Sequence, residues 1–168
     1  MGLAYRLRQL RTILTAGPLP DEARREIAAT LSGPERALFD RYTPGDQWHA
    51  YRVLRMLRDA GYNDPDLLVA ALLHDVGKTR CPLSAWDRTL IVVAQALVPQ
   101  RMAAWGEGAP EGWRRPFVVR AQHAAWGAAM AEAAGSRPAV VDLIRRHQDK
   151  PGEGDAWLTR LQWADDQN

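Results

Sequence analysis

The sequence predicts an all-α protein, a single-domain helical bundle of about eight or nine helices. Residues that start and stop helices recur along the chain, and the apolar residues between them follow a helical spacing. No segment alternates polar and apolar residues between turns as a strand does. With 168 residues, 46% apolar and 25% charged, the chain has the composition of an ordinary globular domain with a sizeable core.

The first helix is expected over residues 3–15, where four leucines follow a helical spacing: Leu3, Leu7, Leu10 and Leu14. Its polar face is rich in arginine. A helix that lies on a surface or a membrane is therefore the alternative to one that packs on the core.

The next two helices begin at recognisable signals. Asp21 opens a second helix after a connector of glycine and proline. Ser32, followed three residues later by Glu35, is a capping box with Pro34 in the first turn. It predicts a short third helix that ends at Phe39.

Two longer helices are expected in the middle of the chain. Residues 43–45 predict a turn, and Asp46 is the expected N-cap of a helix over residues 47–60. An Asp-Pro pair then starts a helix over residues 65–76, which Gly77 is expected to close.

The C-terminal half continues the same pattern. Ser84 is expected to cap a helix over residues 85–97. Residues 105–116 are rich in glycine and proline and predict a loop, which either borders a ligand cleft or simply packs on the protein. Asp155 is the expected cap of the last helix. Three helices complete the bundle, over residues 117–134, 138–147 and 156–166.

Charge and cysteine content narrow the classes of partner. The 22 basic and 20 acidic residues give a net charge of +2, too small to require nucleic acid, although the pI near 9.0 suits phosphate-bearing ligands. The single cysteine, Cys81, excludes an internal disulfide and favours a reducing compartment. The apolar run over residues 90–98 is too short to span a bilayer, and the N-terminus has no uninterrupted signal-peptide core. We therefore expect a cytoplasmic protein without a transmembrane segment.

The strongest functional signal is the stretch LLVAALLHDVGKTR over residues 67–80. Seven apolar residues predict a buried helix, and His74 and Asp75 stand at its end. A buried charge is normally paired or bound to a metal. Lys78 follows closely, in a chain with only one other lysine.

All four histidines lie in predicted helices or at their ends: His49, His74, His123 and His147. Imidazole nitrogens and carboxylate oxygens are ligands of borderline divalent metals. The histidines are at least 24 residues apart, too far for a local metal finger. Each one alone would be an ordinary core or surface residue, so the hypothesis rests on the His-Asp pair and on the joint pattern, with ligands that converge from several helices.

Five segments of the chain resemble the HD-domain metal-dependent phosphohydrolase superfamily. They are HAYRVLRML, DLLVAALLHDVGK, QHAAWGAAM, LIRRHQD and LQWADD, and AALLHDVGK is the most specific of them. The likeness covers residues 46–166. It implies that residues 46–168 form an HD domain and that residues 1–45 are N-terminal helices packing on it as one compact unit.

The resemblance implies a site of the two-metal H…HD…H…H…D type, in which Asp75 bridges the ions. Asp165 is preferred over Asp166 as the last ligand because it follows an apolar residue and alanine, as is common in the family. The metal is open among iron, manganese, cobalt, nickel and magnesium. Six residues are expected to hold one or two divalent ions: His49, His74, Asp75, His123, His147 and Asp165.

The resemblance also implies a mechanism in which metal-bound hydroxide attacks phosphorus, so no separate base is needed. Asp75 and Lys78 are the expected catalytic residues. Lys78 would bind a phosphate oxygen or the leaving group, and the alternative is a charge that complements the helix dipole. Arg52 lies three residues after His49 and is a weaker candidate, as are Arg120, Arg145 and Arg146, each of which could equally form a surface ion pair.

The implied function is hydrolysis of a phosphate ester or anhydride in a small, nucleotide-like phosphorylated substrate. The pattern is closest to compact two-metal members, such as HD-type diadenosine tetraphosphate hydrolases and cyclic-di-AMP-cleaving HD domains. The GYP signature of the cyclic-di-GMP branch does not occur. Two alternatives remain: a non-catalytic HD-fold module that senses a nucleotide, and an HD-type di-iron oxygenase, which His/Asp ligation alone does not exclude.

Overall fold

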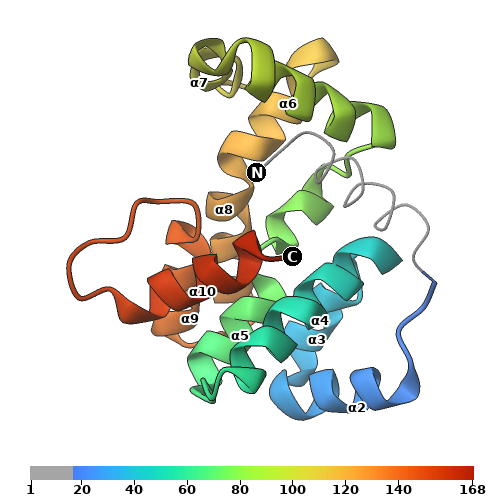
Figure 1. Cartoon of the computed structure of the whole chain (residues 1–168). Coiled ribbons are helices and arrows are strands. Elements are labelled where there is room, and N and C mark those ends of the chain that lie inside the picture. Colours follow the sequence, from blue (N-terminus) through green and yellow to red (C-terminus); the bar gives the residue numbers. More distant parts are fainter. Residues whose placement is uncertain (1–16) are drawn as a thin grey trace.

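A computed structural model describes residues 17–168, and this part of the chain is all-helical, as predicted (Figure 1). It contains nine α-helices, three short 3₁₀ helices and no strands. The helix expected over residues 3–15 lies outside the described residues. The α-helices are α2 (Asp21–Thr30), α3 (Gly33–Phe39), α4 (Pro44–Asp59), α5 (Pro65–Leu73), α6 (Ala85–Leu97), α7 (Met102–Trp105), α8 (Arg115–Ala133), α9 (Pro138–Arg146) and α10 (Ala156–Asp166). The 3₁₀ helices are η1 (Val76–Arg80), η2 (Pro99–Arg101) and η3 (Gly112–Arg114).

Helix α5 is the centre of the bundle. Every residue from Leu67 to Leu73 is buried, because α5 packs against α2, α3, α4, α9 and α10. A helix that is apolar on all sides needs such surroundings. The Asp64 side chain caps it by accepting the backbone N–H groups of Asp66 and Leu67. None of the helices between residues 17 and 168 is long and apolar enough to cross a membrane.

The first helices of the described chain are attached to this core. The predicted capping box of α3 is present, with the Ser32 side chain and Glu35 satisfying each other's backbone N–H groups. The other carboxylate oxygen of Glu35 accepts a hydrogen bond of 2.7 Å from the Ser136 hydroxyl, just after α8. Glu26 of α2 accepts the Tyr51 hydroxyl of α4 at 2.8 Å. These contacts fix α2 and α3 beside the helices that carry the histidines.

The predicted start of α4 is wrong. Its N-cap is Thr43, and Asp46 lies inside the first turn. The Thr43 hydroxyl accepts the Asp46 N–H at 3.3 Å and donates to Asp46 Oδ2 at 2.7 Å. Pro44 suits the first helical position because its φ is already helical. The helix therefore begins within the predicted turn of residues 43–45.

The end of α5 also differs from the prediction. The helix stops at Leu73, and the chain then tightens into η1. Gly77 does not close α5. It lies in η1, which packs closely on α8. A Cβ atom on Gly77 would lie 1.9 Å from the His123 carbonyl oxygen and 2.6 Å from the Gly127 nitrogen. Glycine is therefore required by the close approach of two backbones.

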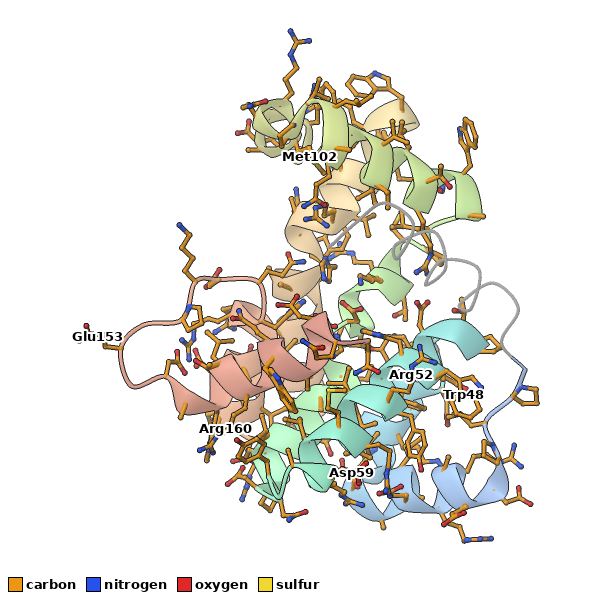
Figure 2. All side chains as sticks on the ribbon, viewed as in Figure 1. Trp48, Arg52, Asp59, Met102, Glu153 and Arg160 are labelled. Atoms are coloured by element: carbon orange, nitrogen blue, oxygen red, sulfur yellow. The ribbon has the colours of Figure 1, made fainter. Side chains whose placement is uncertain are left out.

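Helices α6 and α7 form an arm beside the N-terminal half of α8 (Figure 1), and Met102 marks α7 on it (Figure 2). The loop predicted over residues 105–116 is partly helical, because it contains η3, and α8 begins at Arg115. Trp105 packs edge-to-face against Trp113 and at a tilt against Phe117, with ring centroids 5.4 and 4.9 Å away, and this aromatic cluster orders the segment.

The prediction that the Asp155 side chain caps α10 is wrong, although Asp155 is the N-cap residue. Asp155 occupies the N-cap position, but its side chain makes no capping hydrogen bond. Its carboxylate instead contacts the guanidinium of Arg146. The ion pair takes the carboxylate away from the helix N–H groups.

We expect Gly77→Ala to lower the free energy of unfolding by about 2 kcal/mol or more, because the added methyl group meets backbone atoms of α8 that cannot rotate away. Chemical denaturation measures the change. Gly152→Ala is the matched control, since a Cβ atom at that position would have no other atom within 4 Å, and its effect should stay within about 0.5 kcal/mol. Equal stabilities of the two variants would contradict the close-packing argument.

Candidate metal centre

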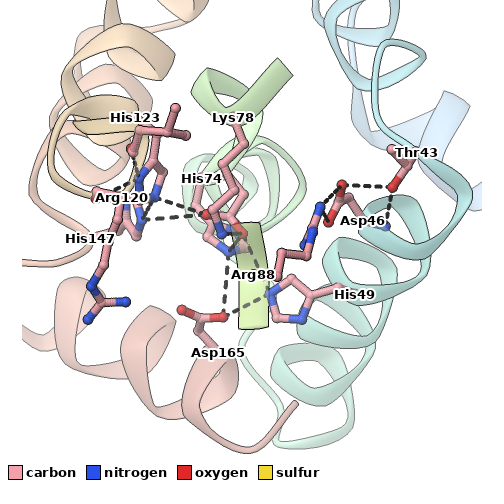
Figure 3. A network of polar contacts seen from close by, with 12 residues as sticks. Thr43, Asp46, His49, His74, Lys78, Arg88, Arg120, His123, His147 and Asp165 are labelled. Atoms are coloured by element: carbon pink, nitrogen blue, oxygen red, sulfur yellow. Dashed lines mark hydrogen bonds and ion pairs between the residues drawn. The ribbon is translucent and has the colours of Figure 1, made fainter. Parts of the chain in front are cut away.

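The structure brings all six predicted metal-site residues into one cluster (Figure 3). They come from five parts of the chain that the core holds together. His49 lies on α4, His74 and Asp75 follow α5, His123 lies on α8, His147 ends α9, and Asp165 lies on α10.

One half of the cluster contains His49, His74, Asp75 and Asp165. Asp165 Oδ1 lies 2.9 Å from His49 Nε2 and 3.5 Å from His74 Nε2. Asp75 Oδ2 lies 3.9 and 3.6 Å from the same two nitrogens. The ligand atoms of His49, His74 and Asp75 all lie within 4.8 Å of one another, close enough to hold a metal ion.

The other half contains His123 and His147 with the second oxygen of Asp75. His123 Nε2 lies 3.2 Å from His147 Nε2 and 3.2 Å from Asp75 Oδ1. His147 Nε2 lies 3.8 Å from the same oxygen. Asp75 therefore presents one carboxylate oxygen to each half of the cluster.

Three of the histidine rings are oriented by the main chain. In each, Nδ1 lies 2.7 to 3.0 Å from a carbonyl oxygen one turn earlier in its own helix, so this nitrogen donates. In a neutral ring this fixes the tautomer, and in all three rings Nε2 points into the cluster, as in metal sites. The pairs are His74 with Ala71, His123 with Val119 and Arg120, and His147 with Ile144.

The donor set fits a divalent metal. With Nδ1 committed as donor, the Nε2 atoms of His123 and His147 face each other and a carboxylate oxygen, and in neutral rings all three atoms are hydrogen-bond acceptors. Such an arrangement is unfavourable in a buried space unless a cation lies between the acceptors. His74 Nε2 is likewise buried and has no hydrogen-bond partner among residues 17–168. Nitrogen and oxygen donors of this kind suit borderline metals.

The protonation states of His74, Asp75 and His147 depend on their burial and on the charges beside them. Burial opposes a charge on His74, but Asp75 and Asp165 outweigh it and raise its pKa to about 9. Burial also opposes ionisation of Asp75, but Lys78 and His74 hold its pKa well below the usual range. Burial and the charge of His74 lower the pKa of His147 to about 4. The proton on His74 thus supplies positive charge where a metal would supply it, while His147 is neutral.

Lys78 lies at the edge of the cluster. Its ammonium group donates to Asp75 Oδ2, and about 29% of its side chain is exposed. The weaker candidate Arg146 is occupied by Asp142 and Asp155. Arg52 and Arg120 also have interactions of their own. Lys78 thus contacts a carboxylate of the cluster directly.

The sequence reasoning missed Arg88 and Asp46. The guanidinium of Arg88, on α6, donates to the carboxylate of Asp46, one turn before His49 on α4 (Figure 3). The spacing from Asp46 to His49 was a signal, because residues three apart share a helix face. Nothing local in the sequence connects Asp46 with Arg88.

The fold and the cluster define a helical protein with His and Asp residues placed to hold divalent metal. The sequence model of the HD domain family matches residues 48–165, more than half of the chain. The chain therefore belongs to the HD domain family, within the metal-dependent phosphohydrolase superfamily. No curated protein and no solved structure matches the chain significantly. The family match extends from just before His49 to Asp165, and so contains all six residues of the cluster.

The positions of Asp165 and Asp166 differ, and they agree with the preference for Asp165 that the family pattern gave. Asp165 contacts His49, whereas Asp166 is exposed. We expect wild-type protein to retain about two metal equivalents after dialysis, and Asp165→Asn to lose about one, because it removes the charge of that oxygen donor. Asp166→Asn is the control and should match wild type. Elemental analysis that finds the same loss in both variants would contradict the assignment.

Metal binding should release protons. Below about pH 9 the ring of His74 carries a proton in the metal-free protein, and a metal requires the neutral ring. Affinity should therefore rise with pH up to about 9. At pH 7.5 His74 should release about one proton on metal binding, whereas His147 is already neutral and should release none. Calorimetry in buffers of different ionisation enthalpy measures the release, and buffer-independent enthalpies would refute it.

Proposed function

We propose that this protein is a hydrolase that cleaves a phosphate ester or anhydride in a nucleotide-like small molecule, with divalent metal ions held by the cluster. The observation that carries the proposal is that the two carboxylate oxygens of Asp75 face different histidines. Its Oδ1 faces His123 and its Oδ2 faces His74, so one buried carboxylate serves two neighbouring groups of histidines. Bound divalent ions would lower the pKa of a water molecule and polarise a phosphoryl oxygen.

In this proposal each half of the cluster would hold one metal ion. His49, His74 and Asp165 would hold one ion, His123 and His147 the other, and Asp75 would bridge them. The main-chain carbonyls that accept Nδ1–H would keep the rings aimed inward during turnover.

Lys78 would act on the substrate. In the metal-free arrangement its ammonium neutralises Asp75. Once metal ions compensate Asp75, the ammonium is available for a phosphate oxygen or for the leaving group. A cation in this position favours an anionic substrate. This supports a phosphate-bearing ligand, which the hydrolase and the module that binds a nucleotide without turnover share, over the di-iron oxygenase. The nucleotide character of the substrate rests on the resemblance to the family.

The test is a phosphate-release screen over nucleotides, phosphomonoesters and phosphodiesters with metal-loaded protein. Asp75→Asn should reduce activity to background, since it removes a charged donor from both halves. Lys78→Met should keep its metal and lower kcat by about 100-fold, the typical effect of losing one group that stabilises transition-state charge. Lys150→Met is the matched control, because Lys150 is the other lysine of the chain and is exposed.

Three results would count against the proposal. Full metal loading with no hydrolysis of any phosphate compound would favour the module that binds a nucleotide without turnover. Two irons with a mixed-valence spectroscopic signal and no hydrolysis would favour the oxygenase. Equal activity of Lys78→Met and Lys150→Met would remove Lys78 from the mechanism.

A further inference from the structure

Ion pairs connect the first turn of α6 with two helices of the cluster, α4 and α8. Asp87 accepts the Ser84 N–H at 2.8 Å as part of a capping box, and its carboxylate contacts Arg115 at the start of α8. The next residue, Arg88, contacts Asp46 on α4. One helical turn therefore connects α4 with α8 through two ion pairs.

The contact between Arg88 and Asp46 is one-sided. A single nitrogen, Nη2, donates to both carboxylate oxygens, at 3.1 and 2.9 Å. A guanidinium group has five N–H donors, and a fork-to-fork ion pair would use two of its nitrogens. Asp46 therefore leaves the N–H groups of Nη1 and Nε for another acceptor. About 18% of the Arg88 side chain is exposed, so a ligand can reach it.

Asp46 is itself fixed. It is buried in the first turn of α4, and its Oδ2 accepts the Thr43 hydroxyl at 2.7 Å. His49 follows one turn later on the same helix face. A carboxylate held in this way orients Arg88, and Figure 3 shows the contact of these two side chains in the same close-up as His49.

We propose that Arg88 binds a second phosphate group, adjacent to the phosphoryl group that the cluster attacks, so that the substrate is a diphosphate or a longer phosphoanhydride. This inference rests on the proposed function and narrows its substrate class. Arginine suits the role because its planar fork matches two phosphate oxygens. An ion pair that served only to hold α6 in place would be stronger if two guanidinium nitrogens donated two parallel hydrogen bonds.

The cleavage balances as an ordinary hydrolysis. The oxygen of water bonds to the first phosphorus, and the bond from that phosphorus to the bridging oxygen breaks. The second phosphate leaves with the bridging oxygen and its electron pair, and the proton lost by water passes to the products or to solvent. Arg88 compensates the negative charge that the leaving phosphate gains in this step.

The experiment compares two ligands that are not hydrolysed, inorganic phosphate and methylenediphosphonate. Their binding to metal-loaded protein is measured by calorimetry. Arg88→Gln should weaken binding of methylenediphosphonate by about tenfold, the loss expected for one charge-assisted contact, and binding of phosphate by less than about twofold. Arg88→Lys keeps the charge beside Asp46 but lacks the planar fork, and should lose most of the same preference.

Arg115→Gln is the matched control, because it breaks the other ion pair of the same helical turn, with Asp87. It should leave the ratio of the two affinities unchanged. The inference is overturned if Arg88→Gln weakens both ligands equally, or if Arg115→Gln produces the same loss, since Arg88 would then only hold α6. An active enzyme whose Arg88 variants keep the preference overturns this inference alone. Protein that binds metal and hydrolyses nothing overturns the proposed function, while the binding ratios remain measurable.

Discussion

The structure depends on one electrostatic constraint: buried imidazole nitrogens and a carboxylate point at one another and need positive charge among them, from a proton or from a metal ion. Asp75 and three main-chain-oriented imidazoles, of His74, His123 and His147, meet in a space that water scarcely reaches. Such a cluster is stable only if the backbone cannot relax away from it. The all-round burial of α5 fixes one side, and the contact of Gly77 with α8 fixes the other.

The constraint also explains the charges at the cluster. In the metal-free arrangement, the proton on His74 and the ammonium of Lys78 compensate Asp75 and Asp165. A metal bound by the cluster would compete with the proton and the lysine for the same negative charge. It would displace the proton from His74 and weaken the hold of Asp75 on Lys78. In the proposed function, metal binding and the availability of Lys78 for a phosphate would therefore be linked by charge alone, without a change of fold.

Local patterns in the sequence predicted most of the helices, and the resemblance to the HD-domain family supplied the proposed ligands. The capping box at Ser32 and the apolar run before His74 each lie within a few residues, and so could be read directly. Features that depend on distant neighbours could not. Asp46 and Arg88 are far apart in the chain, and the need for glycine at Gly77 arises from the backbone of α8. The two tryptophans of the predicted loop contact each other and Phe117, and this three-ring cluster orders the segment.

The two parts of the proposed site differ in how they are supported. The His and Asp cluster is built on core helices, and α5 has an unbroken run of buried residues. Helix α6 has a single buried residue, Ala94, and its first turn is held mainly by two ion pairs. Changes on α6 therefore disturb little of the core, whereas changes at the cluster disturb its packing. If Arg88 binds the second phosphate as proposed, substrate selectivity could therefore vary at Arg88 while the metal cluster stays constant.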